Sequence, residues 1–178
     1  MESINIINKY YTKGTKLYKI LVVHSKAVRD KAVELALLHP EYKMDIQFIK
    51  EAAMLHDIGI FLTNAHGIEC YGNNPYICHG YLGAELLRKE GYPKHALVCE
   101  RHTGTGLTKE MVENFNVGLP LRDMLPLSME EKVICYADKF FSKTKLDKEK
   151  TLEEVEKSLY RYGKDTMDNF EKLKTLFD

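Results

Sequence analysis

The strongest constraint on the fold is a helical pattern that runs from about residue 15 to residue 38. Apolar side chains recur there at intervals of three and four residues, which places them along one face of an α-helix. Pro40 ends the pattern, because proline cannot continue a helix. His24 falls on the apolar face. The segment therefore predicts a long helix that carries a histidine among its core side chains.

Further helical segments follow, and no segment shows the clear alternation of a strand. Asp45 is a good N-cap for one helix, and Ser128 followed by two glutamates has the pattern of a second N-terminus. Helices are expected over 3–11, 46–58, 81–90, 93–102, 129–143 and 151–176, with Gly163 as a candidate break in the last. A long loop is expected over 61–78, and the segment 107–128 is mixed, with one helical turn after Thr108. The sequence predicts an all-α, single-domain helical bundle over 1–178. Its core covers about 20–142, and the C-terminal helix packs on this core or serves as a homodimer contact.

The helix expected over 46–58 ends with His56 and Asp57 side by side, just before Gly59, a candidate helix stop. An unpaired carboxylate in a helix interior costs free energy, which a bound metal ion would remove. Imidazole and carboxylate together suit iron, manganese or zinc. The alternative is that His56 caps the helix and Asp57 begins a turn.

Three more histidines and one more aspartate lie in or beside helical segments. The intervals along the resulting set are 32, 22, 23 and 36 residues, each roughly one helix with its connection. Six such side chains, one of them able to bridge, suit two metal ions about 3.5–4 Å apart. The predicted ligands are His24, His56, Asp57, His79, His102 and Asp138. A single histidine such as His24 is equally explained as a satisfied core residue.

Charge and cysteine content limit the other classes of function. Lys+Arg and Asp+Glu number 26 each, so no general attraction to nucleic acid or to an anionic membrane is expected. No apolar run approaches the roughly 20 residues of a membrane helix, and no signal peptide is visible. The four cysteines form no C-x-x-C pair, which argues against a structural zinc site. Cys99 and Cys135 lie in apolar helical patterns and are expected to be buried thiols. The predicted location is the cytoplasm.

The ordered set of motifs resembles the HD superfamily of metal-dependent phosphohydrolases, in the variant written HDIG. His24, the run His56-Asp57-Ile58-Gly59 and Asp138 match its motif in order and context. The stretches HGYLGAELL (79–87), ERHTGTGL (100–107) and YADKFF (136–141) are similar to the symmetrical diadenosine tetraphosphate hydrolases of that superfamily. The resemblance covers about residues 20–142 and implies an all-α bundle.

The resemblance also implies how the ligands divide. One metal would bind His24, His56, Asp57 and Asp138, and a second would bind His79 and His102, with Asp57 bridging the two. Two cations lower the pKa of a bound water and neutralise charge on a phosphate, so the nucleophile would be a metal-bound hydroxide. Iron or manganese is expected, with cobalt, nickel and zinc as alternatives.

A phosphate substrate also needs cationic and hydrogen-bonding side chains near the metals. The candidates are Lys139, beside Asp138; Arg101 and Thr103, beside His102; and Lys26 near His24. Lys139 is the preferred one, because an Asp-Lys pair at this place resembles the family pattern, and it joins Asp57 as a predicted catalytic residue. Solvated surface positions explain the other cations equally well, and a turn explains Thr103.

The function predicted first is hydrolysis of a small nucleotide or another phosphate ester or anhydride. The second is a diiron oxygenase, since some HD-superfamily members use the same six ligands with iron and oxygen. The third is a non-catalytic, metal-dependent sensor. The loop over 61–78 and the segment over 107–128 carry no family motif. Residues in these two segments are expected to determine which substrate binds.

Overall fold

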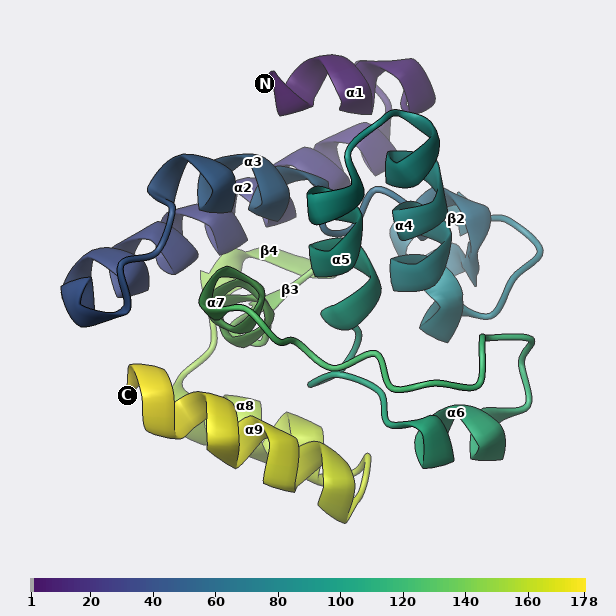
Figure 1. Ribbon diagram of the computed structural model, residues 1–178. Helices are drawn as coiled ribbons and strands as arrows, with labels where there is room; N and C mark the ends of the chain where they lie inside the picture. Colours follow the sequence, from purple (N-terminus) through teal and green to yellow (C-terminus); the bar gives the residue numbers. More distant parts are fainter. Residues whose placement is uncertain (1) are drawn as a thin grey trace.

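The structure is a computed structural model that describes residues 2–178, and it is mostly helical (Figure 1). Its centre is the long helix α2 (Lys16–Leu38), which confirms the periodic pattern of the sequence. Helices α3 (Ile46–Leu55) and α7 (Met129–Asp138) pack directly on α2. The N-caps expected from sequence form: Asp45 accepts a hydrogen bond from the amide of Phe48, and Ser128 from the amide of Glu131.

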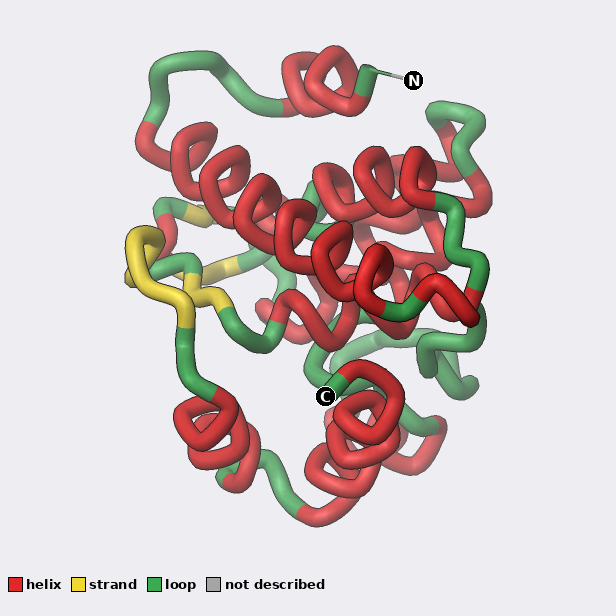
Figure 2. The backbone as a smooth tube through the Cα atoms, turned by 90° about the vertical axis from the view of Figure 1, so that its left-hand side faces the viewer, coloured by secondary structure: helices red, strands yellow, loops and turns green. Residues whose placement is uncertain are grey.

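The remaining helices surround this centre (Figures 1 and 2). Helices α4 (His79–Lys89) and α5 (Pro93–Arg101) form the most closely packed pair and cover α3 and α7 through α5, while α1 (Ser3–Tyr10) lies on α3. Helix α6 (Lys109–Phe115) lies apart, beside the loop that returns to α7. The expected C-terminal helix is two helices, α8 (Leu152–Tyr160) and α9 (Lys164–Phe177), separated by Gly163 with φ 93°.

Two small hairpins are present that the sequence pattern did not predict. Strand β1 (Asn64–Ala65) pairs antiparallel with β2 (Cys70–Tyr71), and β3 (Phe141–Ser142) pairs antiparallel with β4 (Lys145–Glu149). The prediction of a helix over 129–143 is therefore too long, because α7 ends at Asp138. Short 3-10 turns link several elements: η1 (Pro40–Tyr42), η2 (Ile60–Leu62), η3 (His66–Ile68) and η4 (Tyr76–Cys78).

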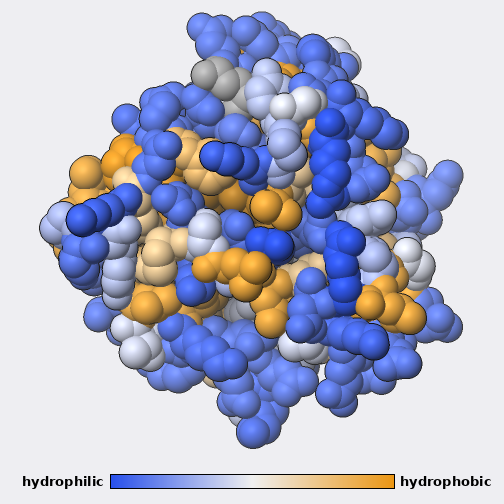
Figure 3. Space-filling view, in the orientation of Figure 1, coloured by the Kyte–Doolittle hydropathy of each residue, from blue (hydrophilic) through white to orange (hydrophobic). Residues whose placement is uncertain are grey.

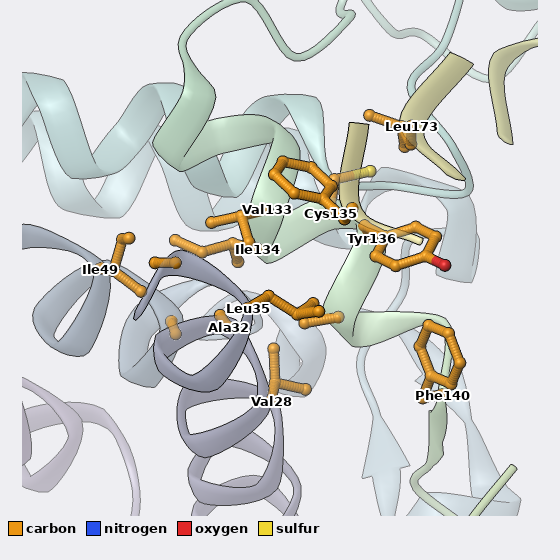
Figure 4. Packing of buried hydrophobic residues seen from close by; sticks show 14 of the residues in the cluster. Val28, Ala32, Leu35, Ile49, Val133, Ile134, Cys135, Tyr136, Phe140 and Leu173 are labelled. Carbon is orange, nitrogen blue, oxygen red and sulfur yellow. The ribbon is translucent and has the colours of Figure 1, made fainter. Parts of the chain in front are cut away.

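The apolar interior consists of two main clusters that meet along α2. One lies between α2, α3, α7 and α9 (Figure 4), where Tyr136 stacks on Phe170 with ring centroids 5.6 Å apart. The other joins α1, the first half of α2, α4 and α5, and it includes Leu21 and Leu87. His24 lies on α2 between residues of the first cluster and residues of the second. The metal-ligand candidates therefore occupy the boundary between the two clusters.

The face of the molecule shown in Figure 3 is mostly hydrophilic, and its apolar residues are confined to a broken band across the middle. All four cysteines are buried and free, which confirms the expectation for Cys99 and Cys135 and extends it to Cys70 and Cys78. Within residues 2–178, no helix is both long enough and apolar enough to cross a lipid bilayer.

Candidate metal centre

The six predicted ligands converge on one buried place, and five of them stand at or next to a helix end. His56 is the C-cap of α3 and His102 is the C-cap of α5. The carbonyl ends of α3, α5 and α7 therefore all meet at the site. Because the C-terminus of a helix carries a partial negative charge, this arrangement favours a bound cation. The ligands and their places are His24 in α2, His56 and Asp57 after α3, His79 at the start of α4, His102 after α5 and Asp138 at the end of α7.

The first group of ligand atoms gathers around one oxygen of Asp57. The Nε2 atoms of His24 and His56 each lie 3.1 Å from Asp57 Oδ2. Asp138 Oδ1 lies 2.9 Å from His24 Nε2 and 3.4 Å from His56 Nε2. These four ligand atoms lie within 4.8 Å of one another, and all four side chains are buried.

The second group gathers around the other oxygen of Asp57. The Nε2 atoms of His79 and His102 each lie 3.3 Å from Asp57 Oδ1, and the two nitrogens are 3.1 Å apart. These atoms also lie within 4.8 Å of one another. Asp57 thus contributes one oxygen to each group, the geometry of a bridging carboxylate.

Backbone carbonyls set the tautomer of three of the histidines. The Nδ1 atoms of His56, His79 and His102 donate to the carbonyl oxygens three residues earlier in the chain, at 2.6–2.7 Å. A neutral imidazole that donates from Nδ1 has its lone pair on Nε2, the atom that faces Asp57 in each case. Such second contacts orient histidine ligands in metal sites. The three rings are therefore held in the orientation that a metal would require, and a ring protonated at Nε2 would release that proton on metal binding.

Several buried polar atoms at the site remain without a hydrogen bond among the described residues. They include His56 Nε2, which is completely buried. Asp57 Oδ2 is also completely buried, and the nearest charged group to it is the Lys143 ammonium at 2.7 Å. A buried nitrogen without a hydrogen-bond partner is costly, and a metal ion would satisfy it. The donor set of imidazole nitrogens and carboxylate oxygens suits iron, manganese or zinc. The residues therefore fit two bound cations.

The pKa shifts show how much negative charge the site concentrates. Burial opposes ionisation of Asp57, but His56, Lys143 and His102 hold its pKa well below the ordinary value. Burial lowers the pKa of His56, yet Asp57 and Asp138 outweigh it and raise that pKa to about 9. Burial, helped by the neighbouring histidines, lowers the pKa of His102 to about 4 despite its contact with Asp57. The carboxylates stay charged and attract a cation.

Lys143 is a member of the site that sequence reasoning missed. It lies in the turn between β3 and β4, and its Nζ is 2.7 Å from Asp57 Oδ2 and 5.8 Å from the ring centre of Tyr76. Burial lowers its pKa, but Asp57, Tyr76 and Asp138 raise that pKa well above the ordinary value. The ammonium is therefore a fixed positive charge at the bridging carboxylate. Lys143 follows Asp138 by five residues, and its return to the site could be predicted only from a hairpin that begins with β3.

A cavity of about 440 Å³ opens beside the ligands. His79, Asp138 and Lys143 form its inner end, and Arg161 and Tyr162, at the end of α8 and just after it, also line it. Four cationic side chains line it, against one carboxylate: Lys139, Lys143, Lys150 and Arg161 face it together with Asp138. In a chain of zero net charge, this excess favours an anionic ligand.

The predicted substrate contacts divide into two pairs. Lys139 lines the cavity and pairs with Asp138 at 2.7 Å, and Thr103 is buried in the cavity wall. Arg101 instead pairs with Glu131 at 2.9 Å. Lys26 is exposed and lines a separate surface hollow. The structure thus brings Lys139 and Thr103 to the cavity, and it does not bring Arg101 or Lys26 there.

Two glycines allow the ligand-bearing segments to approach closely. A methyl group on Gly59 would collide with the backbone of His79 and Gly83 in α4, and one on Gly80 would lie 2.6 Å from the carbonyl oxygen of Cys99 in α5. Gly59 does not stop the helix, as the sequence suggested, since α3 already ends at Leu55. Its role is to let the segment after Asp57 lie against the start of α4, which places Asp57 beside His79.

Comparison with known proteins agrees with this geometry. The model of the HD domain family matches residues 21–142, a range that contains all six ligand candidates. An uncharacterized protein of Methanocaldococcus jannaschii is 41% identical over 128 residues, which cover 70% of this chain and 68% of the relative. No solved structure matches the chain.

Two further relatives are much longer proteins. A tRNA (cytidine(56)-2'-O)-methyltransferase of Thermoplasma volcanium is 32% identical over 133 residues, 74% of this chain and 34% of that enzyme. The enzyme of the same name from Picrophilus torridus is 32% identical over 124 residues, 69% of this chain and 32% of that enzyme. The chain therefore spans about a third of the length of these two relatives.

Proposed function

The chain belongs to the HD domain family, a family of metal-dependent phosphohydrolases, and we propose that it hydrolyses a small phosphate ester or anhydride at a dinuclear site. The observation that carries the proposal is the position of Asp57. Its two carboxylate oxygens each face a separate group of buried ligands, at 3.1–3.3 Å from the histidine nitrogens. A site for a single ion would not need a shared carboxylate between two such groups.

The ligands named above would hold the two ions, with iron or manganese as the metals that this donor set favours. When bound, such ions lower the pKa of water and neutralise charge on a phosphate. Asp57 fixes the relative position of the two ligand groups. His24 and Asp138, which lie 2.9 Å apart, close the first group from the side of α2 and α7.

The protein's own cations would bind the phosphate. Lys143 reaches the site from the cavity side and contacts Asp57. Once cations neutralise this carboxylate, the ammonium is available to a phosphate oxygen. Lys139 takes a similar position beside Asp138, and the hydroxyl of Thr103 lies in the same wall. Lys143, Lys139 and Thr103 are therefore the proposed substrate contacts.

The identity of the substrate is a finer question. The resemblance to symmetrical diadenosine tetraphosphate hydrolases makes dinucleoside polyphosphates one set of candidates. The cavity of about 440 Å³ lies toward the smaller end of ligand pockets, which favours nucleoside monophosphates and other small phosphate esters. Both classes belong in the first screen.

The test is release of inorganic phosphate or nucleotide by the protein purified without oxygen and loaded with iron or manganese. Asp57→Asn keeps the size of the side chain but removes the shared charge, so we expect turnover to fall about a thousandfold or more. Asp30→Asn, at an exposed position of α2, is the matched control and keeps wild-type turnover. Two irons per chain with no hydrolysis of any phosphate substrate would contradict the proposal and favour the diiron oxygenase.

A further inference from the structure

Three of the four cations that face the cavity, Lys143, Lys150 and Arg161, come from the part of the chain beyond the family match, which ends at residue 142. Lys143 belongs to the metal centre described above, and the other two do not. Lys150 follows β4, and Arg161 stands at the C-terminal end of α8. Both line the same cavity as His79 and Asp138. His79, Asp138 and these two cations thus line one cavity but come from different parts of the sequence, and Arg161 is also exposed to solvent.

The two cations differ from the other cavity lysines in their partners. Lys139 and Lys143 each pair with a carboxylate at 2.7 Å. Among residues 2–178, no carboxylate oxygen lies within 4.0 Å of the Lys150 ammonium or the Arg161 guanidinium. Lys150 donates to the carbonyl oxygen of Lys139 at 3.3 Å, and Arg161 donates to the hydroxyl of Tyr162 at 2.7 Å. Neither contact neutralises the charge.

The surroundings of Lys150 add to this excess of positive charge. The residue is half-buried, and burial lowers the pKa of its ammonium. Asp138 and, to a lesser degree, Glu154 oppose this shift, whereas Lys139 and Arg161 add to it. A half-buried ammonium next to other cations is stabilised when an anion binds beside it.

The cavity wall also contains apolar side chains. Leu107, Met111, Phe141 and Leu159 contribute to its lining. A ligand in this cavity therefore meets apolar surface as well as charge, which suits a compact organic group.

We propose that Lys150 and Arg161 form a second anion-binding position, and that the ligand is a compact organic phosphate with a second anionic group, carboxylate or phosphate, at its far end. The phosphate end rests on the proposed function. The second position is a separate claim about the C-terminal segment. The metal site would then supply the chemistry, and Lys150 and Arg161 would select the ligand.

Binding of non-hydrolysable probes tests this directly. Isothermal titration calorimetry on the manganese-loaded full chain compares ω-phosphonoalkanoates of increasing length with alkylphosphonates of matched length. The two series differ only by the terminal carboxylate. At the length that spans the cavity, we expect the carboxylate to tighten wild-type binding about tenfold or more, the effect of one charge-assisted hydrogen bond.

Variants locate the effect. Lys150→Gln and Arg161→Gln should each remove most of the advantage of the carboxylate and change alkylphosphonate affinity by less than about threefold. Lys157→Gln, an exposed position one turn before Arg161 on α8, should keep the whole advantage. If the two variants remove the advantage of the carboxylate, the same titrations with bisphosphates test whether a second phosphate can take its place.

The outcomes separate the two proposals. Equal binding of both series to wild type, or an advantage that all three variants keep, overturns the second anion position and leaves the proposed function standing. Failure of both series to bind the manganese-loaded chain overturns the phosphate position of the proposed function, and the second position falls with it.

Discussion

The charged groups in and beside the cavity fall into two sets with opposite surroundings. At the metal ligands every charged group has a partner: Asp57 faces histidines and Lys143, and Asp138 faces Lys139 and His24. Lys150 and Arg161 line the same cavity without a carboxylate within ion-pair distance in the described chain. The six ligand candidates lie within the matched family region, whereas Lys143, Lys150 and Arg161 lie beyond it.

This difference indicates that the two sets of side chains have different roles. Ligands that must hold metal ions need fixed positions, which burial, helix ends and hydrogen bonds to backbone carbonyls provide. Side chains that select a ligand need accessible charge at the cavity wall. Changes at the metal ligands and their partners are therefore expected to affect the fold or the chemistry, and changes at Lys150 or Arg161 to affect the choice of ligand.

The largest effect on stability is expected at Gly59. The added methyl group of Gly59→Ala would collide with backbone atoms of α4, which cannot move as a flexible side chain can. We expect a loss of about 3 kcal/mol or more in the free energy of unfolding, at or above the upper end of overpacking effects. Urea unfolding followed by circular dichroism measures it.

Gly67 provides the matched control. A methyl group there has no heavy atom within 4 Å, so Gly67→Ala should change stability by less than about 1 kcal/mol. If Gly59→Ala and Gly67→Ala were equally stable, the close approach of the ligand segments would not constrain the fold.

Lys143→Met should weaken the chemistry and leave the metals in place. The substitution removes the cation beside Asp57 and keeps the length of the side chain. We expect kcat/KM to fall about 10- to 100-fold, because a charge-assisted contact to the phosphate is lost. Measurement of turnover and metal content on the same samples tests both expectations.

Lys145 is two residues further along the hairpin and is exposed. Lys145→Met should therefore leave kcat/KM unchanged. Wild-type turnover in Lys143→Met would exclude Lys143 as a phosphate contact. Loss of metal in Lys143→Met would instead assign the residue to support of the ligands.

A smaller effect should come from a buried carboxylate that needs no metal. Glu100 lies on α5 and pairs with Arg88 and Arg122. Burial raises its pKa, but the two arginines outweigh burial and hold that pKa below the ordinary value of 4.5. A lowered folded-state pKa stabilises the protein above the unfolded-state pKa, and this contribution is lost as the pH falls through the folded-state value.

Glu100→Gln should therefore cost about 1–2 kcal/mol at pH 7, since both arginines can still reach water. The difference from wild type should shrink below about pH 4.5. Unfolding in urea at several pH values, with and without chelator, measures it. A difference that is independent of pH, or that appears only with metal, would contradict the ion-pair explanation.

The smallest effect on stability should be at Lys150 and Arg161. Lys150→Gln and Arg161→Gln remove charges without carboxylate partners within ion-pair distance, so each should change the free energy of unfolding by less than about 0.5 kcal/mol. Thermal unfolding tests this. A loss of 2 kcal/mol or more would show that these side chains support the fold and would weaken their role in ligand selection.

The metal ligands could be predicted from the sequence for a physical reason. Buried histidines and aspartates are unusual on apolar helix faces, and they recurred at intervals of one helix. The main helices were also predictable, because α2 has a long apolar face and caps such as Asp45 and Ser128 act locally.

The side chains around the ligands could not be predicted in the same way. The sequence pattern did not indicate Lys143 as a site residue, because the apolar residues Phe140 and Phe141 continue the helical periodicity of α7. In the structure α7 ends at Asp138, and the chain turns and forms β3. A strand of two residues is too short to show alternation. Lys150 and Arg161 lie in charged segments whose sequence resembles any solvated surface, and only the cavity reveals their position.

The most direct test of the central claim is the metal content of the wild type and of His79→Ala, each purified without oxygen. His79 belongs only to the second ligand group, while Asp57 serves both. The account predicts about two metal ions per chain in the wild type and about one in the variant, with an unchanged circular dichroism spectrum. Equal metal content in the two proteins would contradict a dinuclear site bridged by Asp57.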